Sequence, residues 1–339
     1  MHACPVSDVC ASQPRCFLAG ARGDDLTRDA INAATFDERK APREDRASSL
    51  AVKLQVLLDR AHFSPGEIDA RFGENAQKAL RAFAEAHQLG STRVLTADIW
   101  SKLQEIAQAA DPVIADYTIT PEDVKGPFLG KLPAKMEELK PLPRLSFVSA
   151  REALAEKFHM SEQLLAALNP GKAFDRAGES IAVVALDSKA KPAAVTRLEV
   201  DKTRETVKAF AQDGKLVAFV PASVGSVKKP TPSGTLKVTS VQRNPTYRYD
   251  PEFKFRGVKA KQAFVINPGP NNPVGTVWIG LSEKTFGIHG TAEPSRVSKS
   301  ESHGCVRLTN WDAERLAASV KKGVEVNFVE EKQAVKRTR

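Results

Sequence analysis

One histidine and one cysteine near the C-terminus have the types and the spacing that nucleophilic catalysis requires. His289 ends a predicted strand, and Cys305 follows it by 16 residues, directly after Gly304. A cysteine nucleophile needs its proton removed and its thiolate stabilised, and a neighbouring imidazole does both. The backbone N–H groups of Gly304 and Cys305 are candidate oxyanion donors, because a glycine lets the backbone approach a substrate closely. We therefore predict an acyl-transfer site with Cys305 as the nucleophile.

Further residues near Cys305 belong to the same predicted site. His303 is a second imidazole that either contacts the reacting groups or is structural. The planar guanidinium of Arg307 suits a substrate carboxylate, although it could also brace the loop. A helix capped by Thr309 begins soon after Cys305, and its N-terminal dipole would favour the thiolate. A zinc site made of His289, His303 and Cys305 lacks an evident fourth ligand, so we expect no metal and no organic cofactor.

The elements around these residues predict a mainly-β domain over residues 195–330. Apolar and polar residues alternate there, and turn sequences such as Asp213-Gly214 separate the short runs. A helix over 313–320 follows the Thr309 cap. Many short strands with this punctuation are typical of a β-sandwich or barrel-like fold. The predicted strands are 198–200, 207–211, 216–220, 235–241, 263–266, 277–279, 285–288 and 324–328.

Two smaller modules are predicted before the β domain. Apolar residues at helical spacing predict three helices within residues 50–110, around Leu54, Leu80 and Leu103. Residues 144–190 predict a βααβ module, with strands at 145–148 and 181–184 and helices that begin after Ser149 and Ser161. The connecting segments complete an α+β multidomain chain: a disordered leader or linker over 1–49, a linker over 111–143 and a basic tail over 331–339.

Composition excludes several classes of protein. The longest apolar run, 181–186, is too short to span a membrane. Three of the four cysteines lie in the first 16 residues, so a disulfide scaffold is excluded. The net charge of +9 comes from the C-terminal half and points to an anionic partner. We expect no nucleic acid, because the basic residues do not alternate with aromatic ones as single-strand binding requires.

The motif around the two catalytic candidates resembles the signature of the L,D-transpeptidases (the YkuD-type domain), which are bacterial cell-wall enzymes. The resemblance covers about 130 residues. It rests on His289-Gly290-Thr291, on Ser302-His303-Gly304-Cys305-Val306-Arg307, and on supporting matches at 231–234 and 272–276. Residues 50–110 resemble a peptidoglycan-binding helical domain through Leu54-Gln55, Ile68-Asp69 and Phe72-Gly73. Residues 144–190 resemble a LysM module.

The resemblance implies a role for each site residue. Cys305 is the nucleophile, and His289 takes its proton to form a thiolate–imidazolium pair. His303 has a supporting role, the carbonyl of Gly290 orients the His289 ring, and Arg307 positions the substrate. It also implies that Cys305 attacks the carbonyl before the terminal D-alanine of a peptidoglycan stem peptide. D-Alanine leaves, and an amine resolves the thioester.

The products implied are a 3→3 crosslink or the attachment of a wall-anchored protein. Three alternatives stay open: an L,D-carboxypeptidase in which water resolves the thioester, a non-catalytic peptidoglycan-binding protein, and a nucleic-acid binder suggested by charge alone. The implied partners are peptidoglycan stem peptides and glycan, in a periplasmic or cell-wall location. Residues 1–30 lack the 7–15-residue apolar stretch of a secretory signal.

Overall fold

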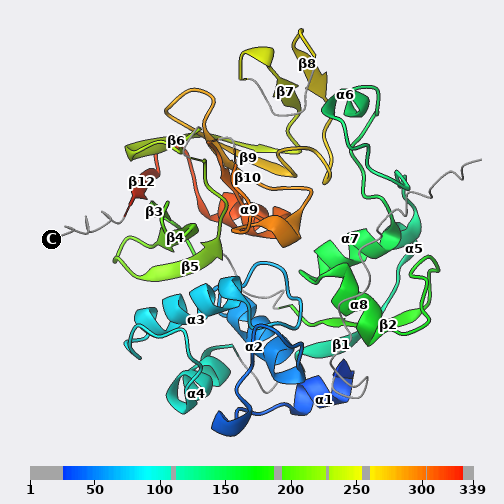
Figure 1. The fold of residues 1–339 in the computed structure, drawn as a ribbon, viewed down its shortest axis with the longest axis vertical. Coiled ribbons are helices and arrows are strands. Elements are labelled where there is room, and N and C mark those ends of the chain that lie inside the picture. The colour runs from blue at the N-terminus through cyan, green and yellow to red at the C-terminus, as the bar shows by residue number, and fades with distance from the viewer. Residues whose placement is uncertain are drawn as a thin grey trace, which may run out of the picture.

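A curled sheet built from the C-terminal part of the chain packs against helices from the N-terminal part (Figure 1). This computed structural model describes residues 26–107, 112–186, 193–226, 229–253, 260–302 and 304–330. His303, Cys4, Cys10, Cys16 and the basic tail lie outside the described residues. In the part of the chain that is described, no helix is long and apolar enough to cross a membrane.

The sheet has eight strands in the order β11-β10-β9-β6-β12-β3-β4-β5. Two neighbouring pairs, β10–β11 and β12–β3, are parallel, and the other pairs are antiparallel. An antiparallel bridge between Ser223 and Arg307 joins the chain after β5 to β11, so the two edges of the sheet meet. The strands are β3 (Arg197–Asp201), β4 (Thr206–Phe210), β5 (Leu216–Pro221), β6 (Gly234–Arg243), β9 (Val277–Leu281), β10 (Gly287–His289), β11 (Val306–Arg307) and β12 (Glu325–Val329).

This closed sheet confirms the predicted barrel-like domain. The alternation of apolar and polar side chains explains the core of this domain. Leu198 and Val200 of β3 are fully buried, whereas Glu199 between them is half-buried. The helix α9 (Asn310–Ser319) packs on β9 and β10, and the Thr309 hydroxyl accepts from the Asp312 N–H as predicted. The sequence missed β11 and the hairpin strand β7 (Tyr247–Tyr249), because two or three residues show no measurable alternation.

The three predicted N-terminal helices are confirmed as α2 (Ser49–Arg60), α3 (Glu74–Ala86) and α4 (Ala97–Ile106). Serine and threonine side chains begin two of them, since the Ser48 and Thr96 hydroxyls accept from N–H groups of the first turn. The Gln55 side chain holds the loop that follows α2, because its amide accepts from the N–H groups of Asp69 and Ala70.

The βααβ unit differs from its prediction in one strand. Helices α7 (Ala150–Lys157) and α8 (Glu162–Leu168) and strand β2 (Ser180–Val184) are as expected. The partner of β2 is β1 (Ile114–Thr118), which the sequence analysis places in a linker, and 145–148 is not a strand. The Leu145 N–H and C=O instead bond Pro268 and Asn271 of the sheet domain, so the backbone groups of Leu145 pair with that domain and not with β2.

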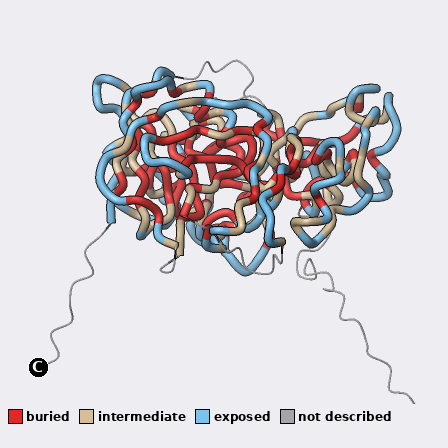
Figure 2. Tube along the Cα trace, turned by 90° about the horizontal axis from the view of Figure 1, so that it is seen from above, coloured by how far each residue is buried: buried red, intermediate tan, exposed pale blue. Residues whose placement is uncertain are grey.

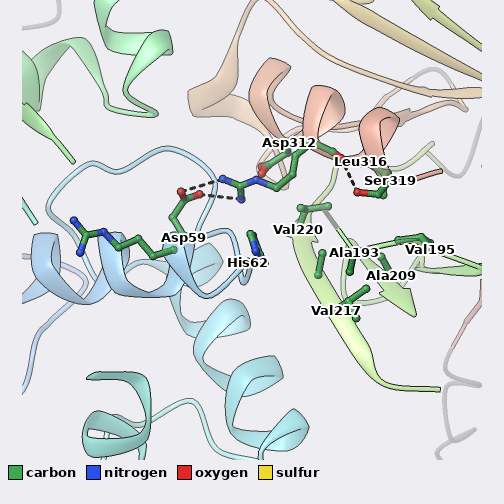
Figure 3. Close-up of a pocket in the computed structure, with 13 residues that line it drawn as sticks. Asp59, His62, Ala193, Val195, Ala209, Val217, Val220, Asp312, Leu316 and Ser319 are labelled. Carbon is green, nitrogen blue, oxygen red and sulfur yellow. Dashed lines mark hydrogen bonds and ion pairs between the residues drawn. The ribbon is translucent and has the colours of Figure 1, made fainter. Parts of the chain in front are cut away.

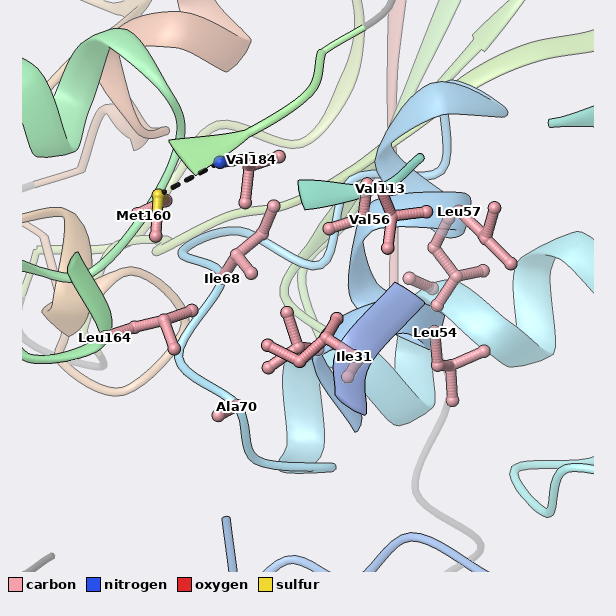
Figure 4. Packing of buried hydrophobic residues seen from close by; sticks show 14 of the residues in the cluster. Ile31, Leu54, Val56, Leu57, Ile68, Ala70, Val113, Met160, Leu164 and Val184 are labelled. Carbon is pink, nitrogen blue, oxygen red and sulfur yellow. Dashed lines mark hydrogen bonds between the residues drawn. The ribbon is translucent and has the colours of Figure 1, made fainter. Parts of the chain in front are cut away.

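Buried side chains of the N-terminal helices and the βααβ unit, together with Phe219 of β5, form one hydrophobic core rather than two (Figure 4). The core combines Leu54 and Leu57 of α2 with Met160 and Leu164 of the βααβ unit. Modules of this size bury too little apolar surface separately, which explains why they share a core. Figure 2 shows the buried residues as an interior covered by exposed loops.

Part of the predicted leader also belongs to this core. Helix α1 (Arg28–Ala33) forms within the segment expected to be disordered, and a short turn of 3-10 helix follows at Glu38–Lys40. Ile31 is 0% exposed. The Asn32 side chain accepts from the N–H groups of Val113 and Ile114, which ties the segment to β1. The prediction of disorder is therefore wrong for residues 26–49.

The predicted linker contains an arm that reaches the sheet domain. After α5 (Pro121–Val124), helix α6 (Met136–Leu139) lies beside the hairpin of β7 and β8 (Phe264–Ile266) (Figure 1). Leu139 of the arm and Leu145, just after the predicted linker, pack with Tyr249, Phe264 and Ile266 of the hairpin in a separate small core. The arm thus braces a hairpin of the sheet domain.

A buried ion pair crosses the boundary between the two halves. Asp59 of α2 is 2% exposed, and its carboxylate accepts from the Arg315 guanidinium of α9 at 3.1 and 3.3 Å (Figure 3). The ring of His159 lies 3.3 Å from the same carboxylate and stacks on Trp311. A cavity of about 80 Å³ beside this pair is lined by residues of α2, β5 and α9.

Candidate active site

Strands β10 and β11 bring the catalytic candidates together. In their parallel register His289 lies opposite Arg307, and Ile288 lies opposite Val306. Side chains alternate along a strand, so His289, Arg307 and Cys305, which precedes β11, share one face of the sheet. The same register places Cys305 opposite Gly287.

The His289 ring is held in one tautomer. Its Nδ1 lies 2.6 Å from the carbonyl oxygen of Gly290, the contact that the sequence analysis expects. A carbonyl oxygen only accepts, so Nδ1 carries the proton and Nε2 keeps its lone pair. The ring stacks on Trp278 of β9 with a centroid distance of 5.7 Å and an interplanar angle of 15°. Gly287 makes room for that indole, because a Cβ there would lie 2.5 Å from it.

Burial drives the thiol of Cys305 and the imidazole of His289 toward their uncharged forms. Desolvation raises the pKa of the Cys305 thiol to about 11, although a hydrogen bond from the Gly287 backbone favours the thiolate. The thiol lies 3.7 Å from the Thr285 carbonyl oxygen. Burial, with a smaller contribution from the Arg307 charge, lowers the pKa of His289 to about 4. Both shifts favour the thiol and the neutral imidazole over the thiolate–imidazolium pair that the resemblance implies.

The Ser302 hydroxyl closes the turn that carries the cysteine. It accepts from the Gly304 N–H at 3.2 Å and donates to the Cys305 carbonyl oxygen. The Gly304 N–H, which the sequence analysis offers as an oxyanion donor, is therefore bonded to Ser302 in this arrangement. Gly304 has a φ of +109°, and a Cβ there would lie 2.9 Å from the Phe286 ring.

The helix that the sequence analysis expects near Cys305 does not follow it directly. Helix α9 begins at Asn310, and β11 lies between it and Cys305 in the sequence. The effect of a helix dipole is strongest at the first turn, so it favours a Cys305 thiolate less than it would favour one next to the helix start.

Residues 195–328 match the family model of the L,D-transpeptidase catalytic domain (YkuD). The chain carries an L,D-transpeptidase catalytic domain. It is 29% identical over 180 residues to YkuD of Bacillus licheniformis, which covers 52% of this chain and 92% of that protein. Identity to the Escherichia coli K12 protein YbiS is 32% over 120 residues, or 34% of this chain and 38% of that protein. The solved L,D-transpeptidase from Mycobacterium smegmatis is 18% identical, with a TM-score of 0.33 over 45% of this chain and 63% of that one.

A buried asparagine organises the loops of the L,D-transpeptidase domain behind His289. The Asn310 side-chain oxygen accepts from the N–H groups of Thr276 and Thr291, each at 3.1 Å. A Cβ at Gly275 or Gly290 would lie 2.0 or 2.2 Å from that oxygen, so both motif positions require glycine. The sequence analysis treats Asn310 only as part of a helix start, and nothing in its local pattern indicates this role.

The loop motif at 231–234 supports the cysteine turn of the L,D-transpeptidase domain. The Thr231 hydroxyl accepts from the Gly225 N–H at 2.7 Å. A Cβ at Gly225 would lie 2.8 Å from the Cα of Gly304, so the two backbones touch. The Ser302 N–H also bonds the Val224 carbonyl oxygen at 2.7 Å, which fixes this face of the turn.

The structure places Arg307 against the loop that precedes the cysteine. Its guanidinium donates to the Ser300 hydroxyl at 3.3 Å and to the Glu301 carbonyl oxygen at 3.2 Å. These contacts match the loop-bracing alternative and use two of the five guanidinium donors. His303, the second predicted imidazole, lies outside the described residues.

Two aromatic residues near the L,D-transpeptidase site were missed by sequence reasoning. Trp278 stacks on His289, and the alternation of β9 alone gives no sign of that contact. Burial raises the pKa of the Tyr247 phenol of β7, and the charge of a Cys305 thiolate raises it further, so Tyr247 lies near Cys305. Among the described residues, no group of three or more His, Cys, Asp or Glu side chains is placed to hold a metal ion.

Proposed function

We propose that this protein is a peptidoglycan L,D-transpeptidase with Cys305 as nucleophile and His289 as general base. The observation that supports this most directly is the hydrogen bond from His289 Nδ1 to the Gly290 carbonyl oxygen, which leaves Nε2 as an acceptor. Cys305 lies on the same face of the sheet, in the strand-end position opposite Gly287. The family of the catalytic domain supplies the substrate class of this proposal.

The resting neutral pair sets the order of proton transfers. As Cys305 Sγ bonds the stem-peptide carbonyl carbon, its proton passes to His289 Nε2, and the carbonyl oxygen takes up negative charge. The Cys305 N–H is the backbone donor that we propose for this oxyanion. The imidazolium then protonates the D-alanine amine as the C–N bond breaks, which leaves a thioester. An acceptor amine attacks the thioester and loses its proton to His289, and the thiol is restored.

Other parts of the chain fit a wall substrate. The guanidinium donors of Arg307 that Ser300 and Glu301 do not use are available for a stem-peptide carboxylate, and we assign Arg307 this second role. His303 would support the turn beside Cys305. The N-terminal helices and the βααβ unit would hold the glycan, in a periplasmic or wall-associated location. The acceptor would be a second stem peptide or a wall-anchored protein.

A carbapenem tests the nucleophile. We expect wild-type protein to gain the mass of one drug molecule and Cys305→Ala to gain none. An unmodified wild-type protein, or an adduct that survives in Cys305→Ala, would contradict the mechanism.

Muropeptide analysis separates the two resolving reactions. Purified protein incubated with sacculi should release D-alanine and produce 3→3 crosslinked dimers, because an amine resolves the thioester. Tripeptides without dimers would instead identify the L,D-carboxypeptidase alternative. Cys305→Ala is the control, and its digest should match untreated sacculi.

A further inference from the structure

One peptide group beside His289 is held from both ends. The carbonyl oxygen of Gly290 accepts from His289 Nδ1 at 2.6 Å, and the N–H of Thr291 in the same peptide donates to Asn310 Oδ1 at 3.1 Å. A peptide group is planar and trans, so its C=O and N–H point in opposite directions. Fixing the N–H on Asn310 therefore fixes the direction in which the carbonyl meets the histidine.

The Asn310 amide has one orientation because all its hydrogen-bonding capacity is used. Its oxygen accepts from two N–H groups, and its nitrogen donates to the Pro270 carbonyl oxygen at 3.2 Å and to Glu156 Oε2 at 3.0 Å. Asn310 is 3% exposed, so water does not replace a lost partner.

Glu156 is the member of this chain of contacts that lies outside the catalytic domain. It belongs to α7 of the βααβ unit. Its carboxyl is half-buried and faces Glu152 of its own helix, Glu314 of α9 and Glu67 of the loop after α2. Burial and these like charges raise the pKa of Glu156 to about 8, whereas the Asn310 amide opposes the shift. The neutral carboxyl still accepts through its carbonyl oxygen.

We propose that Glu156 is a positioning residue for His289. It holds the Asn310 amide, which holds the Gly290–Thr291 peptide, which sets the tautomer and direction of the imidazole. The proposal rests on the proposed function insofar as His289 is the general base. If Glu156 has this role, the contact between the βααβ unit and the sheet domain belongs to the catalytic arrangement. The βααβ unit would then do more than bind the wall.

Histidine side-chain NMR tests the arrangement without requiring activity. In ¹⁵N-histidine-labelled full-length protein, with His289→Gln used to assign the signal, we expect the wild type to show Nδ1-protonated His289. Glu156→Ala should give a mixture of tautomers. Glu156→Gln should keep the wild-type signal, because its amide oxygen accepts from Asn310. A pure Nδ1-protonated signal in Glu156→Ala would overturn the proposal.

Carbapenem acylation gives the second measurement. We expect Glu156→Ala to slow the acylation of Cys305 about tenfold, because a misplaced base loses its alignment, and Glu156→Gln to stay within about twofold of wild type. The matched control is Glu152→Ala on the same helix, whose carboxyl bonds Asn271 instead of Asn310. Equal losses in Glu152→Ala and Glu156→Ala would overturn the proposal in favour of general docking of α7. A wild type that is not acylated would contradict the proposed function alone, since the tautomer measurement still decides the role of Glu156.

Discussion

At the residue scale, two opposing effects act on Cys305 and His289. Hydrogen bonds from the Gly287 backbone to the sulfur and from His289 Nδ1 to Gly290 favour the charged forms, whereas burial favours the neutral ones. Burial is the larger effect for both groups. A neutral resting cysteine is less reactive toward oxidants and stray electrophiles, because only the thiolate is strongly nucleophilic.

This balance predicts the pH dependence of alkylation. The pKa of Cys305 is raised to about 11, so its iodoacetamide alkylation rate should rise about tenfold per pH unit from pH 7 to 10. The rate is measured on the peptide that contains Cys305, with free cysteine as the control, whose rate levels off near its pKa of about 8.5. A plateau for Cys305 between pH 5 and 8 would instead indicate a resting thiolate–imidazolium pair.

Gly290 gives a second prediction at this scale. In Gly290→Ala the new Cβ would lie 2.2 Å from Asn310 Oδ1, so the amide or the loop must move. We expect a loss of about 1–3 kcal/mol in the free energy of unfolding and a carbapenem acylation rate lowered about 100-fold. Gly73→Ala is the control, because a Cβ there meets nothing within 4 Å. A wild-type rate of carbapenem acylation in Gly290→Ala would contradict the tight packing at this position.

At the element scale, the link between α2 and α9 joins the two halves. Asp59 is almost fully buried and accepts from Arg315. Burial raises the pKa of its carboxyl, but the Arg315 charge and the contact with His159 outweigh burial and hold that pKa far below the usual range. Helix α9 also carries Asn310 at its first position, so the same helix contacts both the N-terminal core and the loops behind His289.

Breaking the Asp59–Arg315 ion pair should lower the free energy of unfolding more than breaking an exposed ion pair does. Asp59→Ala leaves the Arg315 charge buried without its carboxylate, and we expect a loss of about 3–5 kcal/mol in the free energy of unfolding by denaturant titration. Asp116→Ala is the matched control. Asp116 pairs with Arg28 at 2.7 Å in an exposed setting, so its removal should lower the free energy of unfolding much less than the removal of Asp59 does. Similar losses in both variants would contradict a special role for Asp59.

At the scale of the whole molecule, acidic side chains gather where the two halves meet. Burial raises the pKa of Glu156 to about 8 and that of Glu67 to about 7. Their folded pKa values exceed those of the unfolded chain, so the stability they contribute is present below about pH 4.5 and is lost as pH rises toward 8. Asp59 has a lowered pKa, so its effect on stability has the opposite pH dependence. The stability that it contributes is lost as pH falls below about 4.

These opposing titrations predict a stability maximum on the acidic side of neutrality. We expect Tm to be highest near about pH 5 and to fall between pH 5 and 8 as buried glutamates release protons on unfolding. Glu156→Gln removes one titrating carboxyl, so Tm should fall less steeply between pH 5 and 8 than in the wild type. Thermal unfolding by circular dichroism measures both proteins across this range. A Tm that rises from pH 5 to 8, or an unchanged slope in Glu156→Gln, would contradict the prediction.

The sequence alone determined the features that depend on local pattern. Alternation located most strands of the sheet, helical spacing located α2, α3 and α4, and hydroxyl side chains marked where helices begin. The spacing of His289 and Cys305 within a specific motif identified the candidate nucleophile and base. These features follow from one residue and its near neighbours, which is what periodicity and capping report.

Only the tertiary structure decided the features that depend on distant partners. Strand β2 pairs with 114–118, and Leu145 bonds the sheet domain. The Gly304 N–H is bonded to the Ser302 hydroxyl, and burial raises the pKa of Cys305. The contact of Glu156 with Asn310 joins residues 154 positions apart. Desolvation and hydrogen-bond competition arise from packing between remote segments, so no local pattern in the sequence encodes them.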